Sequence, residues 1–334
     1  MRIVPFAVIA AAVLPAPVAA QVELSEWQVP WTQSRPRDPM VAPDGRIWFV
    51  GQRSHYAAVF DLATEQFHRY ELPDGAGPHN LLVAPDGIVW YSGNLQAHIG
   101  RLDPATGQIE QIPMPNGSPR DPHTLIFDRQ GDIWFTAQNG NVIGHLATET
   151  RAVRLITVAT ARARPYGIKI APDGRVWVAL FGTSKLGVVD PATFTLTEID
   201  LPRAEARPRR LEITGDGRIW YVDYVGGKLG VYNPADRTFE EWDMPDGRAS
   251  LPYGMAVDAQ DRIWFVETGT RPNRFVGFDP ATESFLEPVD VASGGGAIRH
   301  MYYHAPTNSI WFGTDANTIG RALLDNVRPS RATP

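Results

Sequence analysis

The chain has 334 residues, of which 43% are hydrophobic, with a formal net charge of −6 at pH 7 and no cysteine. A mildly acidic chain lacks the basic surface that nucleic-acid partners require, so we expect no nucleic acid as a partner. Without cysteine no disulfide can stabilise the fold, and packed secondary structure must do so.

The first twenty residues have the pattern of a secretory signal. Met1 and Arg2 give a short basic start, the apolar run IVPFAVIAAAVL follows, and Val18-Ala19-Ala20 is a small-residue cleavage site before Gln21. The run is too short, and too interrupted by proline, to span a membrane. We expect residues 1–20 to be a signal peptide and the mature protein to be periplasmic or secreted, without a membrane span. The alternative is a signal anchor that stays attached.

Seven copies of one phrase, typified by PDGRIWF at residues 43–49, follow along the chain. Their tryptophans are 42 to 47 residues apart: Trp48, Trp90, Trp134, Trp177, Trp220, Trp264 and Trp311. A period in the low forties with Gly/Asp turns and short β-branched or aromatic runs is typical of propeller blades. The sequence therefore predicts an all-β fold, a seven-bladed β-propeller, as a single domain over residues 21–324. A polar C-terminal tail, residues 325–334, follows it.

The second copy shows the expected strands of a four-stranded blade. The segments are GPHNLLVA (77–84), IVWYSG (88–93), HIGRLD (98–103) and QIEQIPMP (108–115), with a Pro-Asp-Gly turn after the first. The last copy ends after its third strand, at TIGRALL (318–324), whereas VELSEWQVP (22–30) matches the fourth-strand phrase. We expect this N-terminal strand to complete the last blade and close the ring, which leaves no long unpaired edge.

One position in each copy is expected to face the central channel. It lies eleven residues before the tryptophan, where the innermost strand begins. Its occupants are Arg37, His79, His123, Tyr166, Arg209, Tyr253 and His300. A purely structural repeat has no need for polar and ionisable groups here, so we interpret these residues as lining a ligand site. The alternative is that they are solvated channel positions without a ligand.

Two groups of side chains near this position carry possible chemistry. His79, Asp121, His123 and Gln138 come from neighbouring copies, and they could hold a divalent ion while one imidazole acts as a base. The alternative for each is a hydrogen-bonding loop residue. The second group is basic and would attract a carboxylate or phosphate: Arg35, Arg37, Arg164, Arg207, Arg209, Arg210 and Arg299. Its alternative is pairing with acids such as Glu205, Glu212 and Asp223.

The repeat phrases resemble those of the streptogramin B lyase (virginiamycin B lyase) family. They include PYGIKIAPDGRVWVA (165–179), PYGMAVDAQDRIWFVE (252–267), GNVIGHL (140–146) and DANTIGRAL (315–323). The resemblance covers residues 22–324 and implies a seven-bladed propeller. It also implies a Mg²⁺-dependent carbon–oxygen lyase, active in antibiotic resistance, that opens a cyclic depsipeptide at its ester by elimination. Such a reaction needs a base for the α-proton and a cation beside the carbonyl.

The family's site residues can be carried over onto two pairs of blades. The last two blades give Tyr253, Ile298, His300 and Asp315, of which the first two depart from the family's His and Glu. Blades two and three match better by type, with His79, Asp121 and His123, although Gln138 replaces an acid. We therefore expect His123 as the base and Asp121 and Gln138 as ligands of Mg²⁺. The substrate-binding residues would be His79, Arg37, Arg209, Tyr166, Tyr253 and His300.

Two further functions compete with the lyase interpretation. A non-catalytic periplasmic binding or scaffold propeller would use the arginines for an anionic ligand or a protein partner. A calcium-dependent lactone hydrolase would need an acidic channel, for which the sequence offers Asp223 and Glu267. In each case the expected ligand at the channel is a small molecule or cyclic peptide. The oligomeric state is unknown from the sequence, and a monomer is the default.

Overall fold

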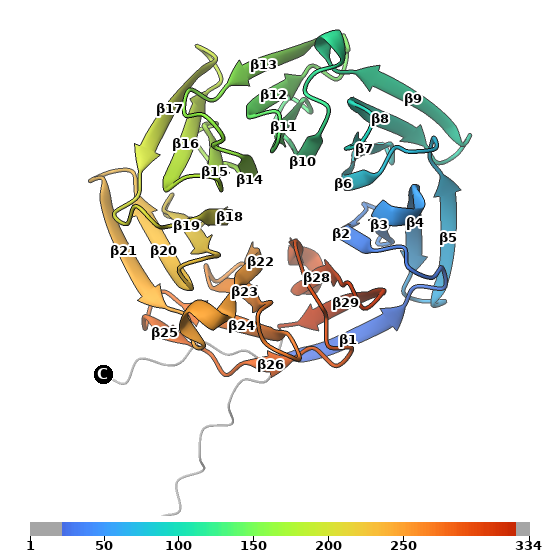
Figure 1. The fold of residues 1–334 in the computed structure, drawn as a ribbon. Coiled ribbons are helices and arrows are strands. Elements are labelled where there is room, and N and C mark those ends of the chain that lie inside the picture. The colour runs from blue at the N-terminus through green and yellow to red at the C-terminus, as the bar shows by residue number, and fades with distance from the viewer. Residues whose placement is uncertain (1–21, 325–334) are drawn as a thin grey trace, which may run out of the picture.

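Each of the seven tryptophan repeats forms one antiparallel β-sheet, and the sheets stand around a central axis as blades of a ring (Figure 1). The structure is a computed structural model, and it describes residues 22–324. The predicted seven-bladed propeller is confirmed. The predicted signal peptide and the predicted C-terminal tail lie outside the described residues.

The first strand of each blade is the innermost and the fourth is the outermost. Blades one to three contain β2 (Pro36–Val41), β3 (Ile47–Gly51), β4 (Tyr56–Asp61) and β5 (Gln66–Glu71); β6 (Pro78–Val83), β7 (Val89–Gly93), β8 (His98–Asp103) and β9 (Gln108–Pro113); and β10 (Pro122–Phe127), β11 (Ile133–Ala137), β12 (Val142–Leu146) and β13 (Val153–Thr157). Blades four and five contain β14 (Pro165–Ile170), β15 (Val176–Leu180), β16 (Lys185–Asp190) and β17 (Thr195–Asp200); and β18 (Pro208–Ile213), β19 (Ile219–Asp223), β20 (Lys228–Asn233) and β21 (Thr238–Asp243).

The last two blades depart from the simple pattern. Blade six contains β22 (Pro252–Val257), β23 (Ile263–Glu267) and β24 (Arg274–Asp279), and its fourth strand is split into β25 (Ser284–Phe285) and β26 (Val289–Asp290). Pro288 lies in the gap, where a residue without an N–H cannot donate to β24. Blade seven contains β27 (Met301–His304), β28 (Ser309–Gly313) and β29 (Thr318–Leu323). Short 3₁₀ turns occur at Gln52–Ser54, Pro115–Gly117, Gly247–Ser250 and Ala305–Thr307.

The N-terminal strand β1 (Glu23–Gln28) completes blade seven, as the sequence predicts. It pairs antiparallel with β29 from Glu23↔Leu323 to Gln28↔Thr318, and it lies on the outer edge of the blade (Figure 1). Asn317 reinforces the closure, because its Nδ2 donates to the carbonyls of Val29 and Trp31 at 3.0 and 2.9 Å. The ring is thus closed by hydrogen bonds between the two ends of the described chain.

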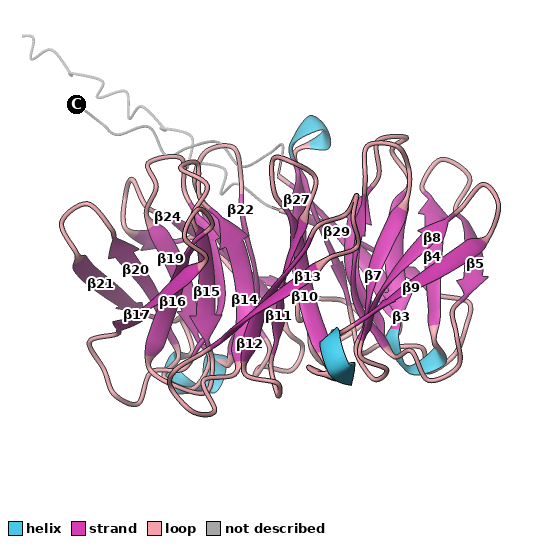
Figure 2. Cartoon of the chain, turned by 90° about the horizontal axis from the view of Figure 1, so that it is seen from above, coloured by secondary structure: helices cyan, strands magenta, loops and turns pink. Residues whose placement is uncertain are grey.

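The tryptophans of the repeat are buried between adjacent blades. Trp48 packs with Val50 of its own blade and with Leu81 and Tyr91 of blade two, and equivalent clusters fill the other interfaces. Burial of each large apolar side chain contributes about 1.5–3 kcal/mol. The repeated Pro-Asp-Gly turn stands at one face of the disc, where Asp44 accepts the N–H of Arg46 at 3.0 Å. We call the other face, where the innermost strands begin, the mouth; Figure 2 shows the disc from the side.

Helices contribute almost nothing to the fold. Among residues 22–324, no helix has the length and apolar character needed to cross a membrane.

Candidate functional site

A β-bulge at the mouth end of the innermost strand shapes the channel. In blades one to six the pairing of the first and second strands shifts register there, for example between Pro122 and Leu125 of β10. A bulge lets successive side chains escape the usual alternation between faces. The sequence-predicted position and the residue after it therefore both reach channel partners. Asn80, which follows His79, donates to Asp38 of blade one at 2.9 Å.

Two histidines from neighbouring blades lie in contact at the channel. The ring centroids of His79 and His123 are 3.6 Å apart, and both residues are buried. Burial lowers the pKa of both imidazoles well below the usual value, and the positive charges of Arg37 and Arg210 lower it further. Both rings are therefore neutral at pH 7. His123 Nδ1 hydrogen-bonds Thr124 Oγ1 at 2.9 Å, whereas His79 Nδ1 has no partner among the described residues.

Two buried guanidinium groups face the same space. Arg210 reaches from blade five across the channel, donating through Nη1 to Thr124 of blade three at 3.2 Å and through Nε to the carbonyl of Arg299 at 2.9 Å. Arg37 donates to Gln52 at 3.1 Å and lies 3.5 Å from a carboxylate oxygen of Asp38. Arg37 is 5% exposed and Arg210 is 4% exposed. Nη2 of each has no hydrogen-bond partner among the described residues.

The opposite side of the channel is aromatic. The guanidinium carbon of Arg209 lies 3.6 Å from the ring centroid of Tyr253, 4.2 Å from Tyr224, 4.6 Å from Phe181 and 5.1 Å from Tyr166. Its Nη2 donates to the Tyr253 hydroxyl at 2.9 Å. The hydroxyls of Tyr166 and Tyr253 also hydrogen-bond each other, although the two residues belong to blades four and six. Arg209 is thereby fixed by aromatic rings from three blades.

The structure brings together most of the residues that the sequence predicts for the site. His79, His123, Tyr166, Arg209 and Tyr253 are joined by ring contacts and hydrogen bonds, including a distance of 4.3 Å between the ring centroids of His123 and Tyr166. Arg37 lies near enough for its charge to lower the pKa of both histidines. His300 is subject to the same charges. Burial lowers its pKa to about 3, the carboxylate of Asp38 opposes this shift, and the positive charge of Arg210 adds to it. Asp38, Asn80 and Thr124 also lie at the channel but were not among the residues predicted from the sequence. Their signal is their place directly after the predicted position, where a bulge turns the next side chain inward.

The proposed metal ligands are occupied by other contacts. The Asp121 oxygens accept the backbone N–H groups of Asn139 at 2.6 Å and Gly140 at 3.0 Å. The amide oxygen of Gln138 accepts from Arg164 Nε at 3.1 Å and Nη2 at 2.6 Å. Mg²⁺ needs near-octahedral oxygen ligands, and a guanidinium beside it would repel it. The residues present therefore do not fit Mg²⁺ at this position, and the role of Asp121 is to hold the loop after β11.

The alternative acidic residues on the mouth face are also engaged. Asp315 of blade seven forms a bidentate ion pair with Arg299, with N–O distances of 2.5 and 2.6 Å. Ile298, which stands where the family pattern has a Glu, is apolar and buried. Asp223 is paired with Arg203 at 2.6 Å, and Glu267 with Arg274 at 2.6 Å. All three carboxylates already pair with a guanidinium group, so none of them offers a free pair of oxygen ligands to a metal ion.

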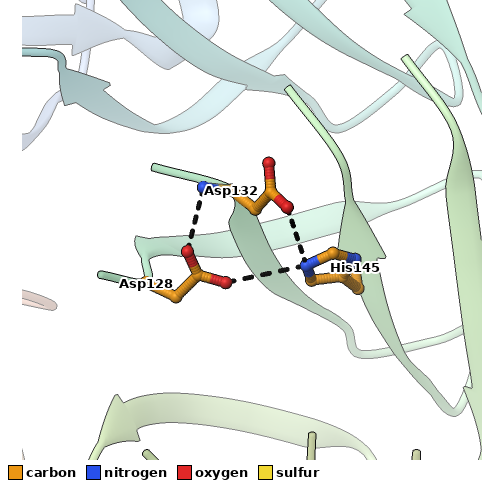
Figure 3. A group of neighbouring side chains, drawn as sticks. All are labelled: Asp128, Asp132 and His145. Carbon is orange, nitrogen blue, oxygen red and sulfur yellow. Dashed lines mark hydrogen bonds and ion pairs between the residues drawn. The ribbon is translucent and has the colours of Figure 1, made fainter. Parts of the chain in front are cut away.

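One group with metal-ligand chemistry occurs among the described residues, at the far end of blade three. Asp128, Asp132 and His145 lie close together, with His145 Nε2 at 3.6 Å from one oxygen of each carboxylate (Figure 3). β10 separates this group from His123, and six extended residues span roughly 20 Å. A cavity of about 1070 Å³ opens on that face, lined by Met40, Val83 and Tyr302 among others. None of the sequence-predicted site residues lines it.

Comparison with known proteins identifies relatives of the whole propeller. The sequence matches the profile of the virginiamycin B lyase family over residues 15–275 and 152–327. No curated protein matches the sequence. Virginiamycin B lyase from Staphylococcus aureus has a similar structure, with a TM-score of 0.82 at 22% identity over 91% of this chain and 99% of that one.

Two further solved structures show the range of the fold. A catalytically inactive histidine-to-alanine variant of the Staphylococcus aureus lyase, with quinupristin, gives a TM-score of 0.82 at 22% identity, covering 91% of this chain and 99% of that one. The extracellular domain of a one-component system from B. thetaiotaomicron gives 0.69 at 16% identity, covering 89% of this chain and 42% of that one. At these identities the structures establish the fold, which serves both an enzyme and an extracellular domain.

Proposed function

The chain belongs to the virginiamycin B lyase family, and we propose that its central channel binds a small anionic molecule. The observation that carries this proposal is the pair of buried guanidinium groups, Arg37 and Arg210, whose Nη2 atoms have no hydrogen-bond partner among the described residues. A buried cation without a full set of partners is costly. A ligand carboxylate or phosphate would supply both the missing acceptors and the missing charge.

The balance of charge at the mouth supports an anion. Around the channel, the charges of Arg35, Arg37, Arg209, Arg210 and Arg299 act on one another or on the buried tyrosines Tyr166 and Tyr253. The carboxylates that interact with these arginines are Asp38, Asp315 and Glu212, and Glu212 is also paired with Lys169 at 2.8 Å. Asp315 is shared by Arg299 and Arg35, and Asp38 also accepts from Asn80. A cleft with an excess of one sign of charge concentrates ligands of the opposite sign.

Calorimetric titration with citrate and with inorganic phosphate tests the proposal. Removing one charge-assisted hydrogen-bonding group costs about 1.5–3 kcal/mol, so Arg37→Met and Arg210→Met should each weaken binding roughly 10- to 100-fold. Arg120→Met, at an exposed loop position, should leave affinity unchanged. Binding should also weaken as salt is added. If neither anion binds, or if the two channel variants bind both anions as the wild type does, the proposal is wrong.

Lyase activity is the second candidate, and family membership together with the neutral His123 favours it. In this scheme His123 accepts the α-proton of a cyclic depsipeptide, while His79 in contact with it helps to hold the substrate. The Mg²⁺ expected from the family would have to bind elsewhere than at Asp121 and Gln138. Incubation with quinupristin should then give a linear product of unchanged mass. Full turnover by His123→Ala would contradict this scheme.

We also propose that the protein works outside the cytoplasm. The support is the pattern of residues 1–20, together with the extracellular location of one structurally similar domain. Sequencing the N-terminus of the protein purified from the cell envelope or medium should give Gln21 as the first residue. A protein that retains Met1 in the cytoplasmic fraction would refute export.

A further inference from the structure

Two aspartates and a histidine of blade three face one another on the side of the disc away from the mouth. Asp128 follows β10, Asp132 precedes β11, and His145 lies in β12 (Figure 3). His145 Nε2 lies 3.6 Å from Asp128 Oδ2 and 3.6 Å from Asp132 Oδ2, and all three side chains are mostly buried. At this distance an imidazole and a carboxylate do not form a direct hydrogen bond. The three side chains therefore converge on one point without satisfying one another.

Blade six contains the same turn with the opposite charge at one position. Asp258 Oδ1 accepts the N–H groups two and four residues further on at 2.9 and 3.0 Å, and Asp128 Oδ1 does the same at 2.9 and 3.0 Å. In both blades the indole N–H of the repeat tryptophan donates to Oδ2. In blade six Arg262 pairs with Asp258 at 2.6 Å. The residue at the equivalent position of blade three is Asp132.

Blade three therefore has two carboxylates where blade six has an ion pair. Neither Asp128 nor Asp132 pairs with a lysine or arginine among residues 22–324. Two adjacent carboxylates repel each other unless a cation lies beside both. His145 is a further departure from the repeat. It stands opposite the tryptophan of its blade, where blades four and five have Val188 and Val231.

Hydrogen bonds to the Oδ1 atoms fix the orientation of both carboxylates. Asp132 Oδ1 accepts the backbone N–H of Thr148 at 2.8 Å and its hydroxyl at 3.2 Å, and Asp128 Oδ1 accepts the two N–H groups of its own turn. The Oδ2 atom of each is the one nearest His145. The His145 ring packs on Trp134, with centroids 4.7 Å apart. Outer partners of this kind hold the ligands of metal sites in place.

We propose that Asp128, Asp132 and His145 bind a Zn²⁺ ion through their two Oδ2 atoms and Nε2. Tetrahedral ligands at about 2.0–2.2 Å from Zn²⁺ are about 3.4 Å apart, close to the N–O separations observed. The three ligand atoms all lie within 4.8 Å of one another. The imidazole selects Zn²⁺ over Mg²⁺ and Ca²⁺, which prefer oxygen ligands alone.

The surroundings of the site provide a path for the ion and room for a fourth ligand. Asp128 also lines the cavity of about 1070 Å³ on this face, so the ion can enter from solvent. Water would occupy the fourth coordination position. The zinc site lies apart from the channel, and it depends neither on the anion site nor on lyase activity.

Zinc titration of the untagged protein tests the site. After treatment with EDTA and dialysis, calorimetry at pH 7.5 in a non-chelating buffer should show one Zn²⁺ bound per chain, and excess Mg²⁺ should not compete. Zn²⁺ should also raise the melting temperature, because it binds the folded state. If the stripped wild type takes up no Zn²⁺, or if Mg²⁺ displaces it, the zinc site does not exist.

Single variants test the three ligands and their support. Loss of an outer partner costs about 10–100-fold in metal affinity, so loss of a ligand in Asp132→Asn or His145→Asn should cost roughly 100-fold or more. Thr148→Val removes only the hydroxyl bond to Asp132 and should cost about 10-fold. His304→Asn is the matched control, because His304 lines the same cavity outside the ligand group, and it should bind Zn²⁺ as the wild type does. Unchanged affinity in His145→Asn would refute the assignment.

A double variant separates metal binding from folding. Asp132→Arg with His145→Val gives blade three the residue types of blades four and five, where Arg175 and Arg218 lie over the repeat tryptophans. It should melt no lower than the metal-free wild type, because the new guanidinium can pair with Asp128, and Zn²⁺ should neither bind nor stabilise it. The channel histidines are the other candidate ligands. Zinc binding that survives in the double variant but is lost in His123→Ala would place the ion in the channel and overturn the inference.

Discussion

Buried charges occur in two regions of the mouth face, and the two regions treat them differently. At the ends of the second strands of blades five and six, Asp223 and Glu267 are fully buried, and each has an arginine partner. Arg203 joins Asp223 at 2.6 Å and also holds Glu241 at 2.6 Å. In the channel, Arg37 and Arg210 are buried too, but part of each guanidinium has no hydrogen-bond partner among the described residues.

This difference separates charges that hold the fold from charges that are placed for a ligand. A compensated buried pair fixes two loops, and breaking it leaves a carboxylate without a counter-charge. An uncompensated cation costs stability, and it persists only where something else benefits from it. It also explains why Asp223 and Glu267 are poor candidates for a calcium site, since guanidinium groups already occupy their oxygens.

The largest effect on stability is expected from breaking the ion pairs that Arg203 forms with Asp223 and Glu241. Arg203→Met leaves Asp223 and Glu241 without their cation, and it should lower the free energy of unfolding by about 3–5 kcal/mol. Urea denaturation measures it, and citrate affinity at a temperature where the variant is folded should match the wild type. A loss of free energy of unfolding below about 1 kcal/mol would mean that the Arg203 ion pairs do not stabilise the fold.

The second largest effect is expected for stabilisation by a bound anion, which should depend on the channel arginines and not on Arg203. A ligand at a hundred times its dissociation constant stabilises the folded state by about 2.7 kcal/mol. Citrate at that excess should therefore raise the melting temperature of the wild type and of Arg203→Met alike. Arg210→Met should gain much less at the same concentration. Equal gains in all three proteins would place the anion somewhere other than the channel.

The pH dependence of stability should report the channel histidines. Burial lowers the pKa values of His79, His123 and His300, the last to about 3, so the folded protein resists protonation at these sites. The unfolded chain binds these protons below its ordinary pKa near 6.5, and stability must fall as the pH falls from there. The loss is at most about 2 kcal/mol per imidazole at pH 5. His300→Asn should flatten this part of the profile in urea titrations at successive pH values.

The smallest effect is expected from the exposed pairs at the Pro-Asp-Gly turns. Asp44–Arg46 and Asp173–Arg175 are close pairs, at 2.7 and 2.6 Å, but all four side chains are nearly half exposed. Exposed pairs contribute about 0–1 kcal/mol, so Arg46→Ala and Arg175→Ala should hardly change the melting temperature. A loss as large as that of Arg203→Met would remove the distinction between exposed and buried pairs.

The sequence repeat allowed both the ring and the position in each blade that faces the channel to be predicted. Because each copy forms the same strands, the residue eleven positions before each tryptophan could be assigned to the channel, and five of these residues are joined there by direct contacts. The closing role of residues 22–30 followed from counting strands in the last copy. Both predictions draw on seven copies of one pattern, so an ambiguous assignment in one copy can be settled by aligning it with the other six.

The individual contacts were not predictable in the same way. The bulge that brings Asp38 and Thr124 inward has no signature in the hydrophobic period, so the second set of channel residues was missed. The carboxylate of Asp121 lies in the expected loop, but the sequence does not reveal that the N–H groups of Asn139 and Gly140 occupy it. Partners of this kind are decided by loop geometry that only the folded backbone fixes.

The pairing of β1 with β29 has a consequence for biosynthesis. Glu23 and Leu323 are neighbours in one sheet, so the final sheet cannot be assembled until the chain as far as Leu323 has emerged from the ribosome. Until then β1 has no partner and β28 lacks its outer neighbour β29, so both strands expose a free edge that invites pairing with another molecule. Contacts of such sequence separation also form late, because the loop that they close is long.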